Sequence, residues 1–170
     1  MSIGSETVGG VRNVTVKNCT FESTENGIRI KSTRGRGGIV ENLVCDGITM
    51  KDVNPAITFT CFYANNSAGD TAPPAAVDEA TRIAEKIPVF RHIRISNLTA
   101  TCPKEAGIIA GLPESCITDV VLDNVKITAA TGFIIQNANN IKLTNSSVVA
   151  KKGPAILAEN AQVEGLETPK

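Results

Sequence analysis

Short runs of alternating apolar and polar residues recur along the chain and share one frame. Each unit reads as an apolar-x-apolar strand, a polar corner residue, and a second apolar-x-apolar strand. The units are Val11–Phe21, Val40–Met50, Phe90–Ala100, Ile117–Ile127 and Asn140–Val149. Their corner positions, 29, 50, 27 and 21 residues apart, hold Asn18, Gly47, Asn97, Asn124 and Asn145. Asn and Gly tolerate the left-handed backbone of an abrupt corner, so the pattern predicts a bend in every unit.

The repetition favours stacked coils over separate hairpins. Each unit is too short to bury its own apolar face, whereas stacking buries a continuous core of Val, Ile and Leu. A second set of apolar runs gives about three strands per coil; its members are Gly27–Lys31, Ala56–Thr60, Gly107–Ala110, Gly132–Ile135 and Ala155–Leu157. We predict an all-β parallel β-helix of about five to six coils, a single domain over residues 1–170, in which corner Asn side chains hydrogen-bond up the stack. A sandwich of hairpins, with a turn at Asn26-Gly27, is the alternative.

The 50-residue step predicts an insertion over residues 64–88. Its first part, Asn65–Pro74, is rich in Asn, Gly and Pro and is typical of a loop. Ala75–Lys86 carries helix-forming residues, so we expect a short surface helix there. Loops on one face of a solenoid often form the wall of a binding groove.

Composition narrows the classes of function. Seventeen basic and seventeen acidic side chains give no net charge, so no overall field attracts nucleic acid or an anionic membrane. The apolar runs fall far short of the roughly 18 residues that span a bilayer. The five Cys residues form no CxxC pair and indicate neither a zinc site nor a disulfide framework. Cys19, Cys45 and Cys61 lie in strand-like runs and are expected to be buried thiols. We expect no metal and no cofactor.

The candidate binding residues are Arg29 and Lys31, which one residue separates in a strand pattern. Period two places both on the outer face, while Ile28 and Ile30 point into the core. Two long cations side by side suit a carboxylate or a phosphate, because Arg supplies a planar fork and Lys a point charge. Arg34 and Arg36 follow in a Gly-rich stretch. On charge alone, a solvated strand face explains this cluster equally well.

The order of several short motifs resembles the polygalacturonases of glycoside hydrolase family 28. Ser2-Ile3-Gly4-Ser5 is followed on the next coil by Arg29-Ile30-Lys31, and Tyr63, the only Tyr, comes at the end of a later strand. Ile87–Ile93 and Gly111–Ser115 are similar to bacterial members. The resemblance implies a right-handed β-helix in which Arg29 and Lys31 bind the carboxylate of galacturonate and Tyr63 contacts the sugar.

The family's catalytic motifs are missing from this sequence. The resemblance leads us to expect an Asn-Thr-Asp motif, an Asp-Asp motif and a Gly-His-Gly motif before Ser2, and the sequence contains none of them. The one histidine, His92, lies in another coil and is expected to be structural. We therefore expect no catalytic residue in this chain, which would be the C-terminal part of a β-helix cut just past the catalytic His and inactive by itself.

The resemblance implies that the complete parent protein hydrolyses α-1,4-linked galacturonate in pectin with inversion, as a secreted or periplasmic monomer acting on an acidic polysaccharide. The alternative is a non-catalytic β-helix that binds an acidic polysaccharide or serves as a scaffold. Nucleic-acid binding through the Arg/Gly run at residues 34–38 is disfavoured, because stacking aromatic residues are missing nearby. The first five residues lack the basic and apolar regions of a signal peptide.

Overall fold

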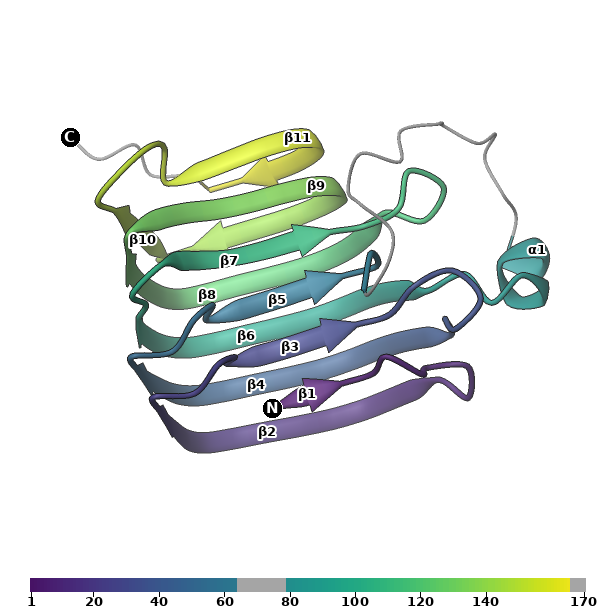
Figure 1. The fold of residues 1–170 in the computed structure, drawn as a ribbon, viewed down its shortest axis with the longest axis horizontal. Helices are drawn as coiled ribbons and strands as arrows, with labels where there is room; N and C mark the ends of the chain where they lie inside the picture. Colours follow the sequence, from purple (N-terminus) through teal and green to yellow (C-terminus); the bar gives the residue numbers. More distant parts are fainter. Residues whose placement is uncertain (64–78, 166–170) are drawn as a thin grey trace.

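The computed structural model describes residues 1–63 and 79–165 (Figure 1). Its strands form one parallel sheet in the order β1-β3-β5-β7-β9-β8-β6-β4-β2, with β10 paired to β8 and β11 to β9. The elements are β1 Ser2–Ile3, β2 Val11–Glu22, β3 Ile28–Lys31, β4 Ile39–Lys51, β5 Ile57–Thr60, α1 Glu79–Ala84, β6 Val89–Thr101, β7 Glu105–Ala110, β8 Ile117–Ala129, β9 Thr131–Thr144, β10 Ser147–Ala150 and β11 Ile156–Glu164. No helix in the described part of the chain has the length and apolar character needed to cross a membrane.

The sheet is wound into a right-handed parallel β-helix, as the sequence predicts. The long strands β2, β4, β6 and β8 stack on one wall, and the short strands β1, β3, β5 and β7 stack on the facing wall (Figure 1). The strand β9 joins the walls, because its first part pairs with β7 and its last part with β8. Every named strand pair is parallel, so the hairpin sandwich is wrong.

The predicted corners are confirmed by the backbone. Asn18, Gly47, Asn97, Asn124 and Asn145 all have positive φ, between 51° and 68°. The predicted Asn ladder exists in part, because Asn124 Nδ2 donates to Asn97 Oδ1 at 2.8 Å. Below this pair the ladder changes composition: Gly47 has no side chain to offer, and Asn97 Nδ2 donates to Asp46 Oδ1 instead, also at 2.8 Å.

A second set of corners was not foreseen from the sequence. It lies five residues before the first and also has positive φ, at Asn13, Asn42, His92, Asp119 and Asn140. Each long strand is thus bent twice, and with its partner from the facing wall each coil has four straight segments rather than the three predicted. Side chains also hydrogen-bond along this second set, with Asn42 Nδ2 donating to Asn13 Oδ1 at 3.2 Å.

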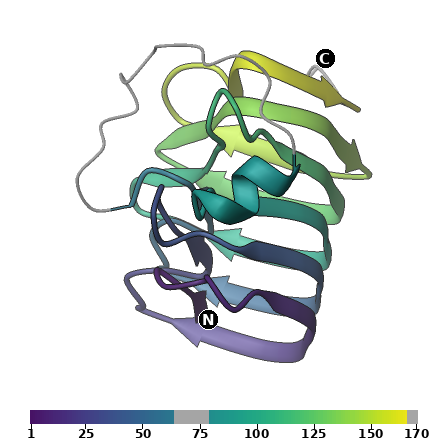
Figure 2. The same cartoon turned by 90° about the vertical axis from the view of Figure 1, so that its right-hand side faces the viewer.

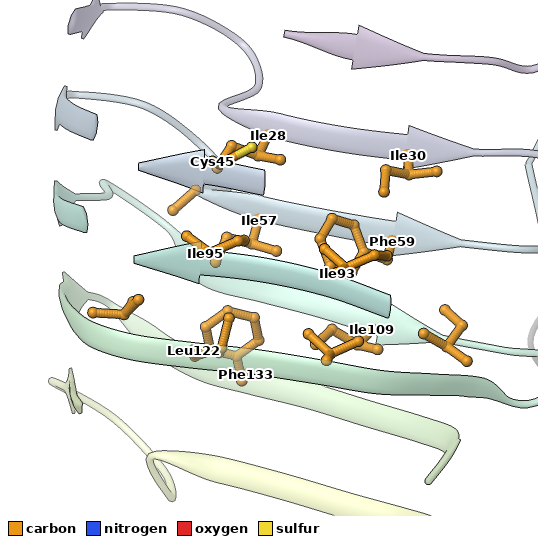
Figure 3. Close-up of a cluster of buried hydrophobic side chains, with 14 of the residues drawn as sticks. Ile28, Ile30, Cys45, Ile57, Phe59, Ile93, Ile95, Ile109, Leu122 and Phe133 are labelled. Atoms are coloured by element: carbon orange, nitrogen blue, oxygen red, sulfur yellow. The ribbon is translucent and has the colours of Figure 1, made fainter. Parts of the chain in front are cut away.

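The core lies between the two walls (Figure 3). Inward side chains of successive coils stack in columns, such as Ile30, Phe59 and Ile109, all fully buried and in register. Large and small residues compensate one another: Gly107 lies in the column between Ile57 and Phe133, and the Phe133 ring fills the space that a side chain on Gly107 would take. Cys45 and Cys61 are buried as predicted, whereas Cys19 is only half-buried.

The predicted helix is present as α1, which lies beyond the carboxyl ends of the short strands (Figures 1 and 2). Its observed bounds fall within the predicted segment 75–86. Residues 75–78 of that segment and the predicted loop 65–74 lie outside the described residues. After the helix, the Lys86 carbonyl accepts a hydrogen bond from Gly37 N at 2.8 Å, which ties this part of the insertion to the turn after β3. At the N-terminal end of the stack, the inward side chains of β2 are only half-buried.

Candidate carboxylate-binding site

The short strand β3 presents Arg29 and Lys31 on its outer face. Ile28 and Ile30 alternate with them and are 1% and 0% exposed in the core, whereas both cations remain half-buried. β3 lies between β1 and β5 in the sheet, with Ser2 beside Arg29 on one side and Thr58 on the other. The alternation predicted from the sequence is therefore confirmed.

Tyr63 lies next to Lys31, although 32 positions separate the two residues in the chain. The Lys31 ammonium is 3.8 Å from the centroid of the Tyr63 ring, in cation–π geometry. The Tyr63 backbone N–H donates to the Ser32 carbonyl at 3.0 Å, so the end of β5 is fixed against the end of β3. The structure thus brings together the three residues that the sequence singled out.

The cation pair has no acidic partner within the described residues. Arg29 Nε donates to the neutral Ser2 hydroxyl at 3.1 Å, and Lys31 contacts the Tyr63 ring. The effect on Tyr63 is plain: hydrogen bonding from Lys31 and the charge of its ammonium lower the pKa of the phenol, and Arg29 adds a smaller effect. Arg29 and Lys31 are adjacent positive charges, and their effect on the Tyr63 phenol shows that they favour the ionised form of a neighbouring acid. They therefore form a site suited to an anion.

The other two cations of the cluster have acidic partners. Arg34 Nε and Nη2 donate to the two carboxylate oxygens of Glu114 at 2.6 and 3.0 Å, and the Glu114 side chain is 3% exposed. Arg36 Nε lies 3.3 Å from Glu6 Oε1. Only Arg29 and Lys31 remain as an open pair, so the sequence cluster of four cations divides into a site and two ion pairs.

Two threonines of β5 lie beside the cation pair, and sequence reasoning missed them. Thr58 is in register with Arg29, and Thr60 with Lys31. Thr60 Oγ1 accepts a hydrogen bond from Phe62 N at 3.1 Å, whereas Thr58 Oγ1 is the one buried side-chain polar atom in the described structure without a partner. The period-two reasoning that placed the two cations on one face would have placed both threonines beside them.

His92 takes no part in this site. It occupies one of the unforeseen corners with a φ of 55°, and its exposed ring lies with Nδ1 3.4 Å from Asp119 Oδ2. Asp119 is the corner residue of the next coil, so the interaction belongs to the stack of corners. The structural role expected for His92 agrees with this position.

The fold and the site define a right-handed parallel β-helix that carries an open cation pair on its short-strand wall. Residues 1–150 match the profile of glycosyl hydrolases family 28, and the chain belongs to that family. The expectation drawn from the short motifs is thereby confirmed.

Similar curated proteins are polygalacturonases from plants and bacteria. The chain is 33% identical over 160 residues to a probable polygalacturonase of Arabidopsis thaliana, covering 90% of this chain and 33% of that protein. It is 29% identical over 139 residues to an endo-polygalacturonase of Pectobacterium parmentieri, covering 82% and 30%. It is 45% identical over 69 residues to a polygalacturonase of Ralstonia solanacearum, covering 38% and 13%. The chain thus spans at most about a third of these relatives. No solved structure gives a significant match.

Proposed function

We propose that this chain is the substrate-binding part of a pectin-degrading glycosidase that hydrolyses α-1,4 linkages between galacturonate units. The observation that carries the proposal is the open pair of Arg29 and Lys31, held side by side on the outer wall without a carboxylate partner in the described residues. Family membership and relatives described as polygalacturonases support galacturonate as the source of the anion.

In the proposed complex each residue has a separate role. The Arg29 fork receives the uronate carboxylate through paired N–H groups, and the Lys31 ammonium adds charge without a fixed direction. The Tyr63 ring holds Lys31 in place and offers a flat face and a hydroxyl to the sugar. These contacts fix the position of one sugar unit, and binding energy gained there can be directed to the transition state at the neighbouring linkage.

Hydrolysis itself needs groups that this sequence does not supply. In an inverting glycosidase, one carboxylic acid protonates the leaving oxygen while a carboxylate activates water, across a gap of roughly 6.5–9.5 Å. The motifs that would carry these groups are missing from the sequence. We infer that this chain binds but has negligible turnover by itself.

The test is a titration of the chain with short galacturonate oligomers, in which calorimetry measures the dissociation constant. Lys31→Ala and Arg29→Ala each remove one charged partner of the carboxylate and are expected to weaken binding about tenfold or more. Lys126→Ala is the matched control, because Lys126 is an exposed lysine of β8 on the other wall. Equal affinity of the wild type and Arg29→Ala would remove the proposal.

A non-catalytic acidic-polysaccharide-binding or structural β-helix is the second candidate. It is favoured by the same lack of catalytic motifs in the sequence. Joining the chain to upstream coils that carry those motifs separates the two, because reducing ends released from polygalacturonate would exclude a purely binding role. For the complete protein we propose action outside the cytoplasm, since a polymeric substrate cannot enter a cell, and a monomeric state, which the family resemblance implies.

A further inference from the structure

The outer face of the short-strand wall continues beyond the cation pair as two rows of residues in register. One row runs from Arg29 through Thr58, Ile108 and Ile134 to Leu157, and the other from Lys31 through Thr60, Ala110 and Gln136 to Glu159. The inward neighbours of the rows, such as Ile109 and Ile135, are buried in the core. Both rows therefore lie on the outer face of the wall that carries the proposed carboxylate site, although Ala110 in the second row is buried at 1% exposure.

The first row changes from charged to apolar along the stack. Past Arg29 comes Thr58, and then three aliphatic side chains on β7, β9 and β11. Exposure rises along the row, with Ile108 half-buried, Ile134 36% exposed and Leu157 57% exposed. Adjacent large aliphatic residues that remain exposed on a sheet face indicate a surface that contacts a ligand.

The second row ends with the opposite charge. Gln136 Nε2 donates to Glu159 Oε2 at 2.9 Å, so a carboxylate occupies the far end of the face. A second uronate carboxylate placed there would meet like charge beside an apolar row, without a cation to receive it among these row residues. Such an arrangement disfavours a uniformly charged ligand and favours one that is anionic at only one end.

Thr58 lies between the charged and apolar parts. It is only 9% exposed, and its hydroxyl has no hydrogen-bond partner among the residues that the structure describes. Arg29 donates to Ser2, on the β1 side of β3 and thus away from Thr58. Because this hydroxyl oxygen is buried, Thr58 marks the boundary between the charged and apolar parts of the row and is not itself a contact for a ligand.

We propose that the face formed by Ile108, Ile134 and Leu157 binds uncharged sugar units, such as methyl-esterified uronates, beyond one free uronate at Arg29 and Lys31. The inference rests on the proposed function and adds a substrate preference to it. Ile134 lies three strands from Arg29, or roughly 14 Å at the usual strand spacing, so the face is long enough for several sugar units. The ester methyl groups contact the aliphatic side chains, and the absence of charge avoids Glu159.

The probes are two galacturonate oligomers of equal length. In one, every carboxylate is free, and in the other, every unit is methyl-esterified except one terminal unit. The free terminal unit is placed at the reducing end in one preparation and at the non-reducing end in another. The wild type is expected to bind the esterified oligomer as tightly as the free one, or more tightly. Ile134→Lys places a cation in the apolar row and is expected to shift the ratio of dissociation constants about fivefold toward the free oligomer. Val149→Lys is the matched control, because Val149 is 56% exposed on β10, which pairs with the other wall.

The outcomes separate this inference from the proposed function. If Arg29→Ala weakens both oligomers while Ile134→Lys leaves their ratio unchanged, the carboxylate site stands and the uncharged-unit site is wrong. If Arg29→Ala weakens neither oligomer, the proposed function fails. A shift with Val149→Lys as large as that with Ile134→Lys would show only a general charge effect and would also overturn the inference. Leu157→Lys, at the more exposed end of the row, is used if Ile134→Lys does not fold.

Discussion

Replacing Gly107 by alanine tests whether the columns of the core are packed as tightly as the structure indicates. A Cβ atom on Gly107 would lie 2.4 Å from the Ile57 carbonyl oxygen and 2.5 Å from Cε1 of Phe133. Carbon atoms in contact are normally about 3.5–4.0 Å apart, so one of these neighbours must move. The Ile57 carbonyl belongs to the stacked sheet and has little freedom, whereas the Phe133 ring is fully buried.

The magnitude follows from two opposing effects. Overpacking a dense core costs about 1–3 kcal/mol. Alanine also reduces the conformational freedom of the unfolded chain, which stabilises the folded state by about 0.4–1 kcal/mol. We therefore expect Gly107→Ala to lower the free energy of unfolding by about 1–2 kcal/mol. Urea denaturation followed by far-ultraviolet circular dichroism measures the change.

Two further variants make the test specific. Gly9→Ala is the matched control, because a Cβ on Gly9 meets nothing within 4 Å and Gly9 does not have a positive φ; its expected effect lies between none and a stabilisation of about 1 kcal/mol. In a Phe133→Leu background the ring contact is relieved and the carbonyl contact remains, so Gly107→Ala should cost less but still be destabilising. Equal midpoints for Gly107→Ala and Gly9→Ala would refute the packing argument.

Three other predictions concern charge and assembly. Hydrogen bonds from two arginines on the neighbouring coils lower the pKa of Glu41. Its ionised form therefore stabilises the fold at pH values above the unfolded pKa. At pH 7 we expect the free energy of unfolding of the wild type to exceed that of Glu41→Gln by about 1–2 kcal/mol. This difference should close below roughly pH 4.3, as pH falls through the folded pKa; a pH-independent difference in urea midpoints would contradict it. Phenolate absorbance reports on Tyr63 alone, the only Tyr in the chain, and should titrate below the usual value of about 10. Lys31→Met should move that midpoint upward, and an unchanged midpoint would show that Lys31 does not act on the phenol. Finally, the half-buried inward side chains and unpaired edge of β2 predict that this chain alone self-associates. Sedimentation of a monomer at all concentrations would count against that expectation.

The recurrent features of the fold could be predicted because each coil repeats them. Asn or Gly occupies every one of the corners at 18, 47, 97, 124 and 145, and only such residues adopt positive φ readily. The second set of corners varies in residue type and includes His92 and Asp119, so no shared letter marks it. Its signal is the constant spacing from the first set, which becomes visible once both are aligned.

The site could be predicted only where its residues are close in sequence or repeat the strand period. Arg29 and Lys31 share a face because they lie two positions apart. The ion pair of Arg34 with Glu114 joins residues 80 positions apart, and it decides which cations remain open. That pairing depends on how two turns meet in space, which no local pattern encodes. The contact of Tyr63 with Lys31 could be expected only through the family resemblance.

The constant distance between the two corners of each long strand leaves differences in length between coils to the connections that join the two walls. The two corners lie five positions apart in each of the five coils that have both, whereas the connections from short to long strands contain 7 residues after β3, 28 after β5 and 6 after β7. Length can therefore vary beside the cation pair without disturbing the hydrophobic column. A lineage could thus alter which polymers reach the surface by rebuilding these connections alone, while the scaffold that holds Arg29 and Lys31 stays the same.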